Sequence, residues 1–219
     1  MTSTRTTLHG SGHHGSGTSE AARLETLWAG EFGNEYIDRN LAAYDRRGEF
    51  WLPLMDELQP QSVLEVGCNV GGNLQWITQR VEPKFVTGVD VNAKALRLLD
   101  QRVPGVRGVH APARDLPVGD RSIDFVFTMG VLIHQPEETL DKVMSEMVRV
   151  SSRYVFCGEY FDTETVEVPY RGHERALFRR DYGNLFLDLF PHELTLVRQG
   201  YLSPEEGWDR VTWWLFERA

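Results

Sequence analysis

Short apolar segments alternate with amphipathic segments through the middle of the chain. The apolar runs predict strands at 62–66, 84–91, 106–110, 123–129 and 153–161, and the amphipathic runs predict helices at 72–81, 92–103 and 136–150. Several of the apolar runs lack a polar residue at every second position, which is typical of strands buried on both faces. The pattern therefore predicts an α/β fold in which helices cover both faces of a mostly parallel sheet, joined by right-handed crossovers.

Two further amphipathic stretches precede this region. Residues 19–33 and 34–58 place apolar side chains at helical spacing, and Pro60 ends the second stretch. We expect Ser19 to cap the first helix and Asn34 to cap the second. We interpret residues 20–60 as a helical lid.

The first 19 residues are rich in glycine, serine, threonine and histidine. No carboxylate pair or cysteine accompanies the imidazoles, so a flexible, solvated tail is favoured over a metal site, and no metal is predicted.

Two strands are predicted near the end of the chain, at 192–202 and 210–219. The seven-residue connection SPEEGWD is short enough for an antiparallel hairpin. With no internal repeat, we expect residues 20–219 to form a single domain.

Composition narrows the functional classes. The chain has 219 residues, of which 41% are hydrophobic, and a formal net charge of −9. An acidic balance argues against a broad nucleic-acid surface, and we expect no nucleic-acid partner. Cys68 and Cys157 lie in apolar runs and are interpreted as buried free thiols. The sequence has no secretory signal and no apolar run of about 18 residues, so we expect a cytoplasmic protein without a membrane partner.

The segment VLEVGCNVGGN (63–73) places a glycine turn between a strand and a helix. No lysine follows as in a Walker loop, which excludes that type of phosphate site. A dinucleotide fingerprint, GxGxxG, requires a second glycine where Asn69 stands, and that side chain fits a pyrophosphate poorly. S-adenosylmethionine, which carries no phosphate, is compatible with Gly67, Asn69 and Gly71.

An acid ends the next predicted strand. Asp90 can accept two hydrogen bonds from a ribose diol, although it could instead cap the helix that begins near Ala93. The same acid would also serve NAD. Glu65 lies inside a buried strand, where it could orient the glycine loop or balance positive charge on a ligand.

Two later segments favour the sulfonium nucleoside. Ala113 and Arg114 could lie against adenine, and TMGVLIHQP follows the fourth strand, where ligands of open α/β sheets bind. His134 in this segment is either a site residue or a structural histidine.

These motifs resemble class I S-adenosylmethionine-dependent methyltransferases, and more narrowly the pseudaminic acid biosynthesis-associated methylase family. The narrower resemblance is carried by LWAGEFGNEYIDRN, VLEVGCNVGGNLQW, TGVDVNAKAL, GVLIHQP, GEYF and VPYRGHERALFRRDYGN, and it extends from about Leu24 onward. It implies a Rossmann-like, seven-stranded sheet with an antiparallel C-terminal hairpin, and S-adenosyl-L-methionine as cofactor. Met129 and Gln135 depart from the residues expected in the GVLIH segment.

Three sets of site residues are predicted. The cofactor set is Tyr36, Arg39, Glu65, Gly67, Cys68, Asn69, Gly71, Asn73, Asp90, Val91, Ala113, Arg114, Met129 and His134. The substrate set is Glu35, Glu159, Tyr170, Arg171, His173 and Arg179. The catalytic set is His134, Glu159 and Tyr160.

The predicted function is methyl transfer to nitrogen or oxygen of a polar small molecule. Arg171 and Arg179 suit a carboxylate, whereas Glu159 and Glu35 suit a cationic amine or guanidinium. A basic amino acid would use both, and an amino sugar is the second candidate. The alternatives are an NAD-dependent oxidoreductase, disfavoured by the missing GxGxxG and the lack of a Tyr-x-x-x-Lys pair, and a non-catalytic nucleoside-binding scaffold. A homodimer is kept as a hypothesis.

Overall fold

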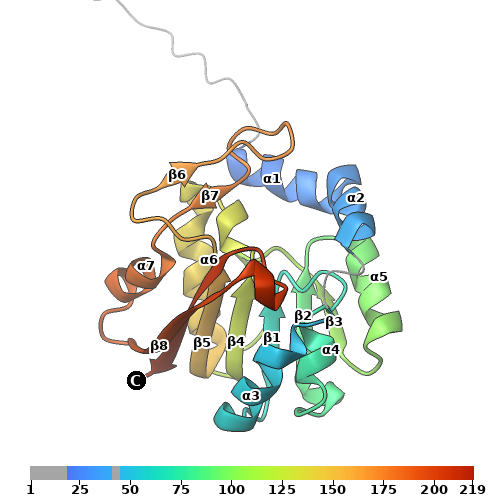
Figure 1. Ribbon diagram of the computed structural model, residues 1–219, viewed down its shortest axis with the longest axis vertical. Coiled ribbons are helices and arrows are strands. Elements are labelled where there is room, and N and C mark those ends of the chain that lie inside the picture. The colour runs from blue at the N-terminus through green and yellow to red at the C-terminus, as the bar shows by residue number, and fades with distance from the viewer. Residues whose placement is uncertain (1–18, 41–44) are drawn as a thin grey trace, which may run out of the picture.

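The computed structural model describes residues 19–40 and 45–219, and the predicted tail therefore lies almost wholly outside the described residues. A seven-stranded sheet forms its centre, in the order β3-β2-β1-β4-β5-β9-β8 (Figure 1). The strands are β1 (Val63–Val66), β2 (Val86–Asp90), β3 (Arg107–His110), β4 (Ile123–Met129), β5 (Ser151–Glu159), β8 (Leu194–Leu202) and β9 (Val211–Arg218). Strand β9 pairs antiparallel with β5 and β8, and the other pairings are parallel. This confirms the predicted mostly parallel sheet with an antiparallel C-terminal hairpin.

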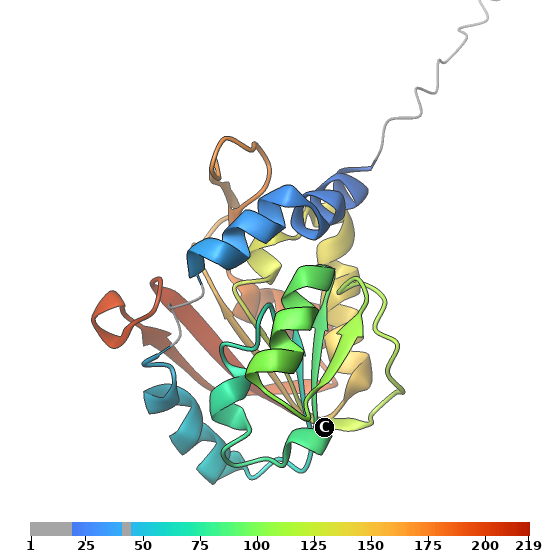
Figure 2. The ribbon, with the colours of Figure 1, turned by 90° about the vertical axis from the view of Figure 1, so that its right-hand side faces the viewer.

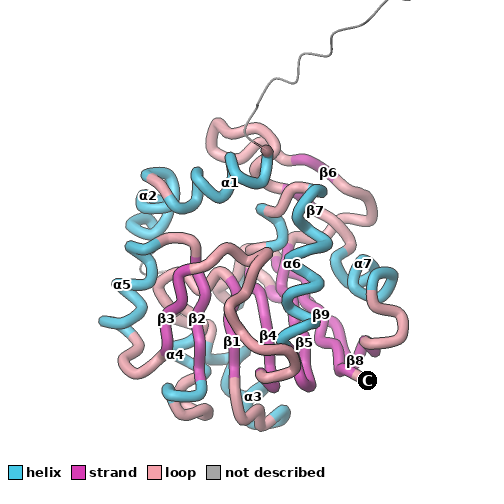
Figure 3. Tube along the Cα trace, turned by 180° about the vertical axis from the view of Figure 1, so that it is seen from behind, coloured by secondary structure: helices cyan, strands magenta, loops and turns pink. Residues whose placement is uncertain are grey.

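Helices cover both faces of the sheet. The longer helices are α1 (Glu20–Ala29), α2 (Glu31–Asn40), α3 (Gly48–Leu58), α5 (Ala93–Arg102), α6 (Glu137–Val150) and α7 (Tyr182–Leu189). The short ones are α4 (Leu74–Ile77), η1 (Pro83–Phe85), η2 (Leu132–His134) and η3 (Pro204–Glu206). In Figure 2 α5 faces the viewer, and Figure 3 shows α5 at one edge of the molecule and α6 against the face of the sheet that is seen from behind.

Alternate strand residues supply two separate cores. Phe125 and Phe127 of β4 pack with α3 and α4, whereas Val126 between them packs with α6. Every residue of β1 is buried. Because successive side chains point to opposite faces, a strand covered on both sides needs apolar residues at consecutive positions.

The first two helices differ in part from the prediction. The Ser19 side chain accepts the backbone N–H of Ala22, which confirms this cap. The predicted cap at Asn34 is wrong, because α2 begins at Glu31 and the Asn34 N–H donates to the Gly30 carbonyl (3.0 Å). Its side-chain oxygen instead accepts from Asn92 (3.1 Å), a partner distant in sequence. The predicted helix 34–58 is therefore divided between α2 and α3.

The segment after β5 contains elements that its mixed composition did not indicate. Strands β6 (Val166–Glu167) and β7 (Phe178–Arg179) form a small antiparallel sheet, and α7 follows them. Strand β7 contacts η2, so this excursion lies beside the carboxyl ends of the central strands. Cys68 and Cys157 are both free and buried, as expected.

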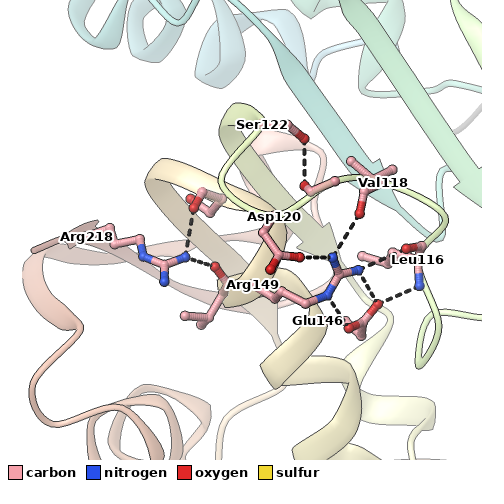
Figure 4. A network of polar contacts seen from close by, with 10 residues as sticks. Leu116, Val118, Asp120, Ser122, Glu146, Arg149 and Arg218 are labelled. Atoms are coloured by element: carbon pink, nitrogen blue, oxygen red, sulfur yellow. Dashed lines mark hydrogen bonds and ion pairs between the residues drawn. The ribbon is translucent and has the colours of Figure 1, made fainter.

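A polar network fixes the loop between β3 and β4 (Figure 4). Arg149 near the end of α6 donates to Glu146 (2.6 Å), to Asp120 (2.6 Å) and to the Leu116 and Val118 carbonyls (both 2.9 Å). Figure 4 also shows Arg218, which donates to backbone carbonyls at the end of α6. One guanidinium thus connects a helix to a loop that has little regular structure of its own.

We expect Arg149→Ala to lower the free energy of unfolding by about 1–3 kcal/mol, because the Leu116 and Val118 carbonyls and Asp120 lose the donor and Glu146 loses its ion pair. Urea unfolding followed by circular dichroism measures this change. Lys142→Ala on an exposed position of the same helix is the matched control and should change it by less than about 0.5 kcal/mol. Equal effects of the two substitutions would contradict a structural role for the network.

Candidate functional site

A cavity lies at the carboxyl ends of β1, β2 and β4, below α1 and α2. Its floor is formed by the turns that follow these strands, including Gly67, Asp90 and Gly130. Leu24, Trp28 and other residues of the two helices form its cover. This is the edge of an open α/β sheet at which ligands generally bind.

Two positions of the glycine turn leave no room for a side chain. Gly67 has φ +74°, and a Cβ there would lie 2.4 Å from the Val131 side chain. Gly71 has φ +78°, and a Cβ there would lie 2.5 Å from the Leu99 side chain of α5. Only Gly67 of these two lines the cavity. Gly71 thus serves the packing of the turn against α5.

Asp90 links the turn after β1 to the turn after β2. Its Oδ2 accepts the Asn69 N–H (2.8 Å) and its Oδ1 accepts the Asn92 N–H (2.8 Å). Burial raises the pKa of Asp90, and these backbone donors oppose the rise. A carboxylate has about four lone-pair sites, so each oxygen still has capacity to accept a hydroxyl from a ligand.

A second carboxylate is buried under the cavity. Glu65 is 1% exposed, and its Oε1 accepts from the Asn73 amide (2.5 Å). The Asn73 oxygen in turn accepts from Arg47 (2.9 Å) and from the Trp51 indole (3.1 Å). Glu65 Oε2 has no hydrogen-bond partner among residues 19–40 and 45–219, and burial raises the pKa of Glu65 to about 8. At neutral pH the Glu65 carboxyl of the free protein is thus protonated, and a cationic ligand group beside its orphaned oxygen would favour the ionised form.

A third carboxylate, Glu159, supports the floor without lining the cavity. It is fully buried and accepts the N–H groups of Val131 and Ile133 (both 3.2 Å), which belong to the turn after β4. Burial raises the pKa of Glu159 to about 7, although the backbone donors lower it. Glu159 therefore positions the 130–134 turn.

His134 lines the cavity as a neutral side chain. Its Nδ1 lies 2.6 Å from the Ala176 carbonyl oxygen, so this nitrogen carries the proton and donates. Burial lowers the pKa of His134 to about 4. Such an imidazole is a weak proton acceptor at neutral pH.

The covering helices are held by aromatic and ionic contacts. The Trp28 ring lies 4.5 Å from His134 and 5.3 Å from both Phe32 and Tyr36. Glu25 of α1 pairs with Arg114 (2.6 Å) from the loop after β3. The α1–α2 pair thus closes the cavity above the loop that follows β3.

The cavity brings together most of the predicted cofactor residues. Its lining includes Tyr36, Glu65, Gly67, Cys68, Asn69, Asn73, Asp90, Val91, Ala113, Met129 and His134. Arg114 does not line the cavity, but it donates to Glu25, which does. Arg39 does not line it and instead pairs with Glu35 on α2 (3.2 Å).

The predicted substrate residues are dispersed. Tyr170 and His173 pack against Trp28 and Phe32 outside the cavity, and Arg171 lies over the Tyr170 ring. Tyr160 and Arg179 line a different cavity, described below.

Sequence reasoning missed several lining residues, notably Arg47, Trp28 and Asn92. Arg47 lies in the charged stretch YDRRGEF, which resembles an ordinary solvated turn. Its approach to Asn73 depends on how α3 packs against α4, and no local pattern reports that packing.

Within the described part of the chain, no group of three or more His, Cys, Asp and Glu side chains could hold a metal ion. The described helices are also too short or too polar to cross a bilayer.

Comparison with known proteins agrees with this geometry. Residues 63–153 match the family model of a methyltransferase domain. The chain is 33% identical over 96 residues to phthiotriol/phenolphthiotriol dimycocerosates methyltransferase 1 of Mycobacterium ulcerans, a match covering 43% of this chain and 35% of that relative. The chain therefore spans about a third of the length of the curated relatives it matches.

Two solved structures share the fold along nearly their whole length. The 1,6-didemethyltoxoflavin-N1-methyltransferase of Burkholderia thailandensis has a TM-score of 0.69 at 16% identity, covering 96% of this chain and 98% of that one. The magnesium protoporphyrin IX methyltransferase of Synechocystis has a TM-score of 0.67 at 14% identity, covering 94% and 100%. The Rossmann-like fold is thus confirmed, and residues 63–153 are similar to a methyltransferase domain. The narrower pseudaminic acid-associated family stays a prediction.

The buried carboxylates predict a fall in stability with rising pH. The folded chain keeps the Glu65 proton up to about pH 8, whereas the unfolded chain loses it near 4.5, so this stabilising contribution is complete below 4.5 and is lost as the pH approaches 8. Glu159 acts in the same direction up to about pH 7. Between pH 7 and 8 we expect Glu65 to account for a loss of about 1 kcal/mol.

Urea unfolding at pH 7 and 8 tests this expectation. Glu65→Gln keeps the shape and the acceptor for Asn73, and it should remove most of the fall. Glu164→Gln, at an exposed position, should leave the fall unchanged. An equal fall in the Glu65 variant would show that this carboxyl is ionised throughout.

Proposed function

We propose that this protein is an S-adenosylmethionine-dependent methyltransferase that acts on nitrogen or oxygen of a polar small molecule, such as a basic amino acid or an amino sugar. The main support is one cavity in which an open glycine turn, the Asp90 carboxylate and the orphaned Glu65 oxygen lie together. The methyltransferase domain over residues 63–153 supports the same reading.

The residues present fit each part of this cofactor. Asp90 would accept the ribose hydroxyls with the capacity left on its two oxygens. Val91, Ala111 and Ala113 would contact adenine. Glu65 would face the amino group of the methionine moiety, for which Gly67 leaves the backbone open.

The cofactor, when bound, supplies a methyl group on a sulfonium sulfur, and the departing thioether needs no acid. The protein residues then have to bind the acceptor, align it and exclude water, which together can supply roughly 7–11 kcal/mol. A general base is needed only when the acceptor carries a proton that must leave.

The predicted catalytic residues suit binding and alignment of the acceptor. His134 has a pKa of about 4 and is therefore neutral at neutral pH. Burial and nearby acids raise the pKa of Tyr160 above its usual value, so Tyr160 keeps its proton. Tyr160 is thus a hydrogen-bond donor toward an acceptor. Glu159 would act by holding the turn that carries His134.

An NAD-dependent oxidoreductase is not favoured. Asn69, with φ +48°, stands where a dinucleotide fingerprint requires its second glycine, and it lines the cavity. A non-catalytic scaffold would share the nucleoside site but would support no turnover.

We expect Asp90→Asn to raise the dissociation constant for S-adenosylhomocysteine at least tenfold, because charge-assisted bonds of about 1.5–3 kcal/mol each are weakened. Calorimetric titration measures the constant, with NAD as the comparison ligand for the parent protein. Asparagine keeps the side-chain volume, and thermal unfolding reports whether the two turns stay folded.

Asp100→Asn, at an exposed position on α5, is the control and should bind like the parent. Unaltered affinity in the folded Asp90 variant would remove the ribose assignment. Absence of S-adenosylhomocysteine binding to the parent protein would reject the proposed function itself.

A further inference from the structure

A second cavity lies at the same edge of the sheet. It opens over the ends of β5, β8 and β9, where Thr212 is paired with both Glu159 and Tyr201. The first cavity lies over β1, β2 and β4, and β4 is the neighbour of β5 through the pair Met129 and Gly158. The two cavities are therefore consecutive along one edge.

Arg47 connects the two cavities. It lines the first, and its guanidinium lies 4.5 Å above the ring of Trp208, which lines the second. Trp208 is 4% exposed and packs against Phe50 (5.8 Å between ring centroids). Arg47 and Trp208 thus form a stacked pair at the boundary between the two cavities.

Aromatic rings line much of the second cavity. Tyr160, Phe161, Tyr201 and Trp208 all contribute, from β5, the segment after it, β8 and the β8–β9 loop. Phe161 and Tyr201 are 40% and 53% exposed. Large exposed rings gathered at one concave site are typical of a binding surface that covers them.

The charged residues of this cavity are two arginines and one acid. Arg179 and Arg210 line it together with Asp209. The Arg179 Nε–H is buried and has no hydrogen-bond partner among the residues that the structure describes, while its Nη2 lies 3.3 Å from Asp162. Guanidinium groups bind carboxylates and phosphates through paired N–H donors.

We propose that the second cavity holds the methyl acceptor, and that this acceptor is a ring-shaped small molecule bearing an anionic group. The ring would lie among the four aromatic side chains, and the anionic group would bind Arg179 and Arg210. The nucleophilic nitrogen or oxygen would point toward Tyr160, Met129 and Arg47, where the two cavities meet. This inference rests on the proposed function and narrows its substrate class to ring-shaped acceptors, which excludes an open-chain basic amino acid.

Binding of small probes to the protein saturated with S-adenosylhomocysteine tests the proposal. The probes are 4-hydroxybenzoate, phenyl phosphate and glucuronate as ring-shaped anions, and 4-hydroxybenzamide as the neutral counterpart of the first. We expect at least one anion to bind five-fold or more tightly than the amide in titrations followed by saturation-transfer NMR. Which anion binds best separates carboxylate from phosphate and an aromatic ring from a sugar ring.

Arg179→Gln and Arg210→Gln should each reduce that preference at least three-fold while S-adenosylhomocysteine affinity stays within two-fold of the parent. Tyr201→Ala, at a half-exposed ring, should weaken all probes alike. Arg107→Gln on β3, at the opposite end of the sheet, is the control and should change nothing.

Two results would overturn the proposal. One is equal or absent binding of charged and neutral probes to a protein that binds S-adenosylhomocysteine, which would leave the proposed function standing. The other is a preference for anions that survives in both arginine variants and would place the anion elsewhere.

Discussion

The arrangement of this protein depends on the hydrogen bonds that Asp90 makes to two turns. Its carboxylate accepts one N–H from the turn after β1 and one from the turn after β2. These turns belong to neighbouring parallel strands, so one side chain sets their spacing at the edge of the sheet. This link shapes the cavity floor and the orientation of the glycine turn, and it holds the backbone of Asn92, the residue that caps α5.

Buried carboxylates recur below the site, and each has a different environment. Asp90 accepts the N–H groups of Asn69 and Asn92, Glu159 accepts those of Val131 and Ile133, and Glu65 accepts an amide N–H on one oxygen while its other oxygen is orphaned among the described residues. Charge is expensive to bury, and a carboxylate with fewer donors holds its proton to higher pH. Two of these groups position backbone, whereas one oxygen of Glu65 has no hydrogen-bond partner among the described residues.

The cofactor side and the proposed acceptor side are built differently. The first cavity is closed by α1 and α2 through Trp28 and the pair of Glu25 with Arg114. The second is bounded by the β8–β9 loop and the segment after β5, with aromatic and arginine side chains. Arg47, which lines the first cavity, lies over the ring of Trp208, which lines the second.

The sequence by itself determined the order of strands and helices in the sheet, the glycine turn after β1 and the position of Asp90 at the end of β2. These features depend on local patterns of apolar and glycine residues. Consecutive apolar positions specify strands buried on both faces, and a strand end followed by glycine specifies an open turn. Only the tertiary structure decided that Glu159 lies under the floor, that Arg39 pairs with Glu35, and that Tyr160 and Arg179 share a cavity with Trp208. Those placements depend on long-range packing of irregular segments, for which spacing along the chain carries no signal.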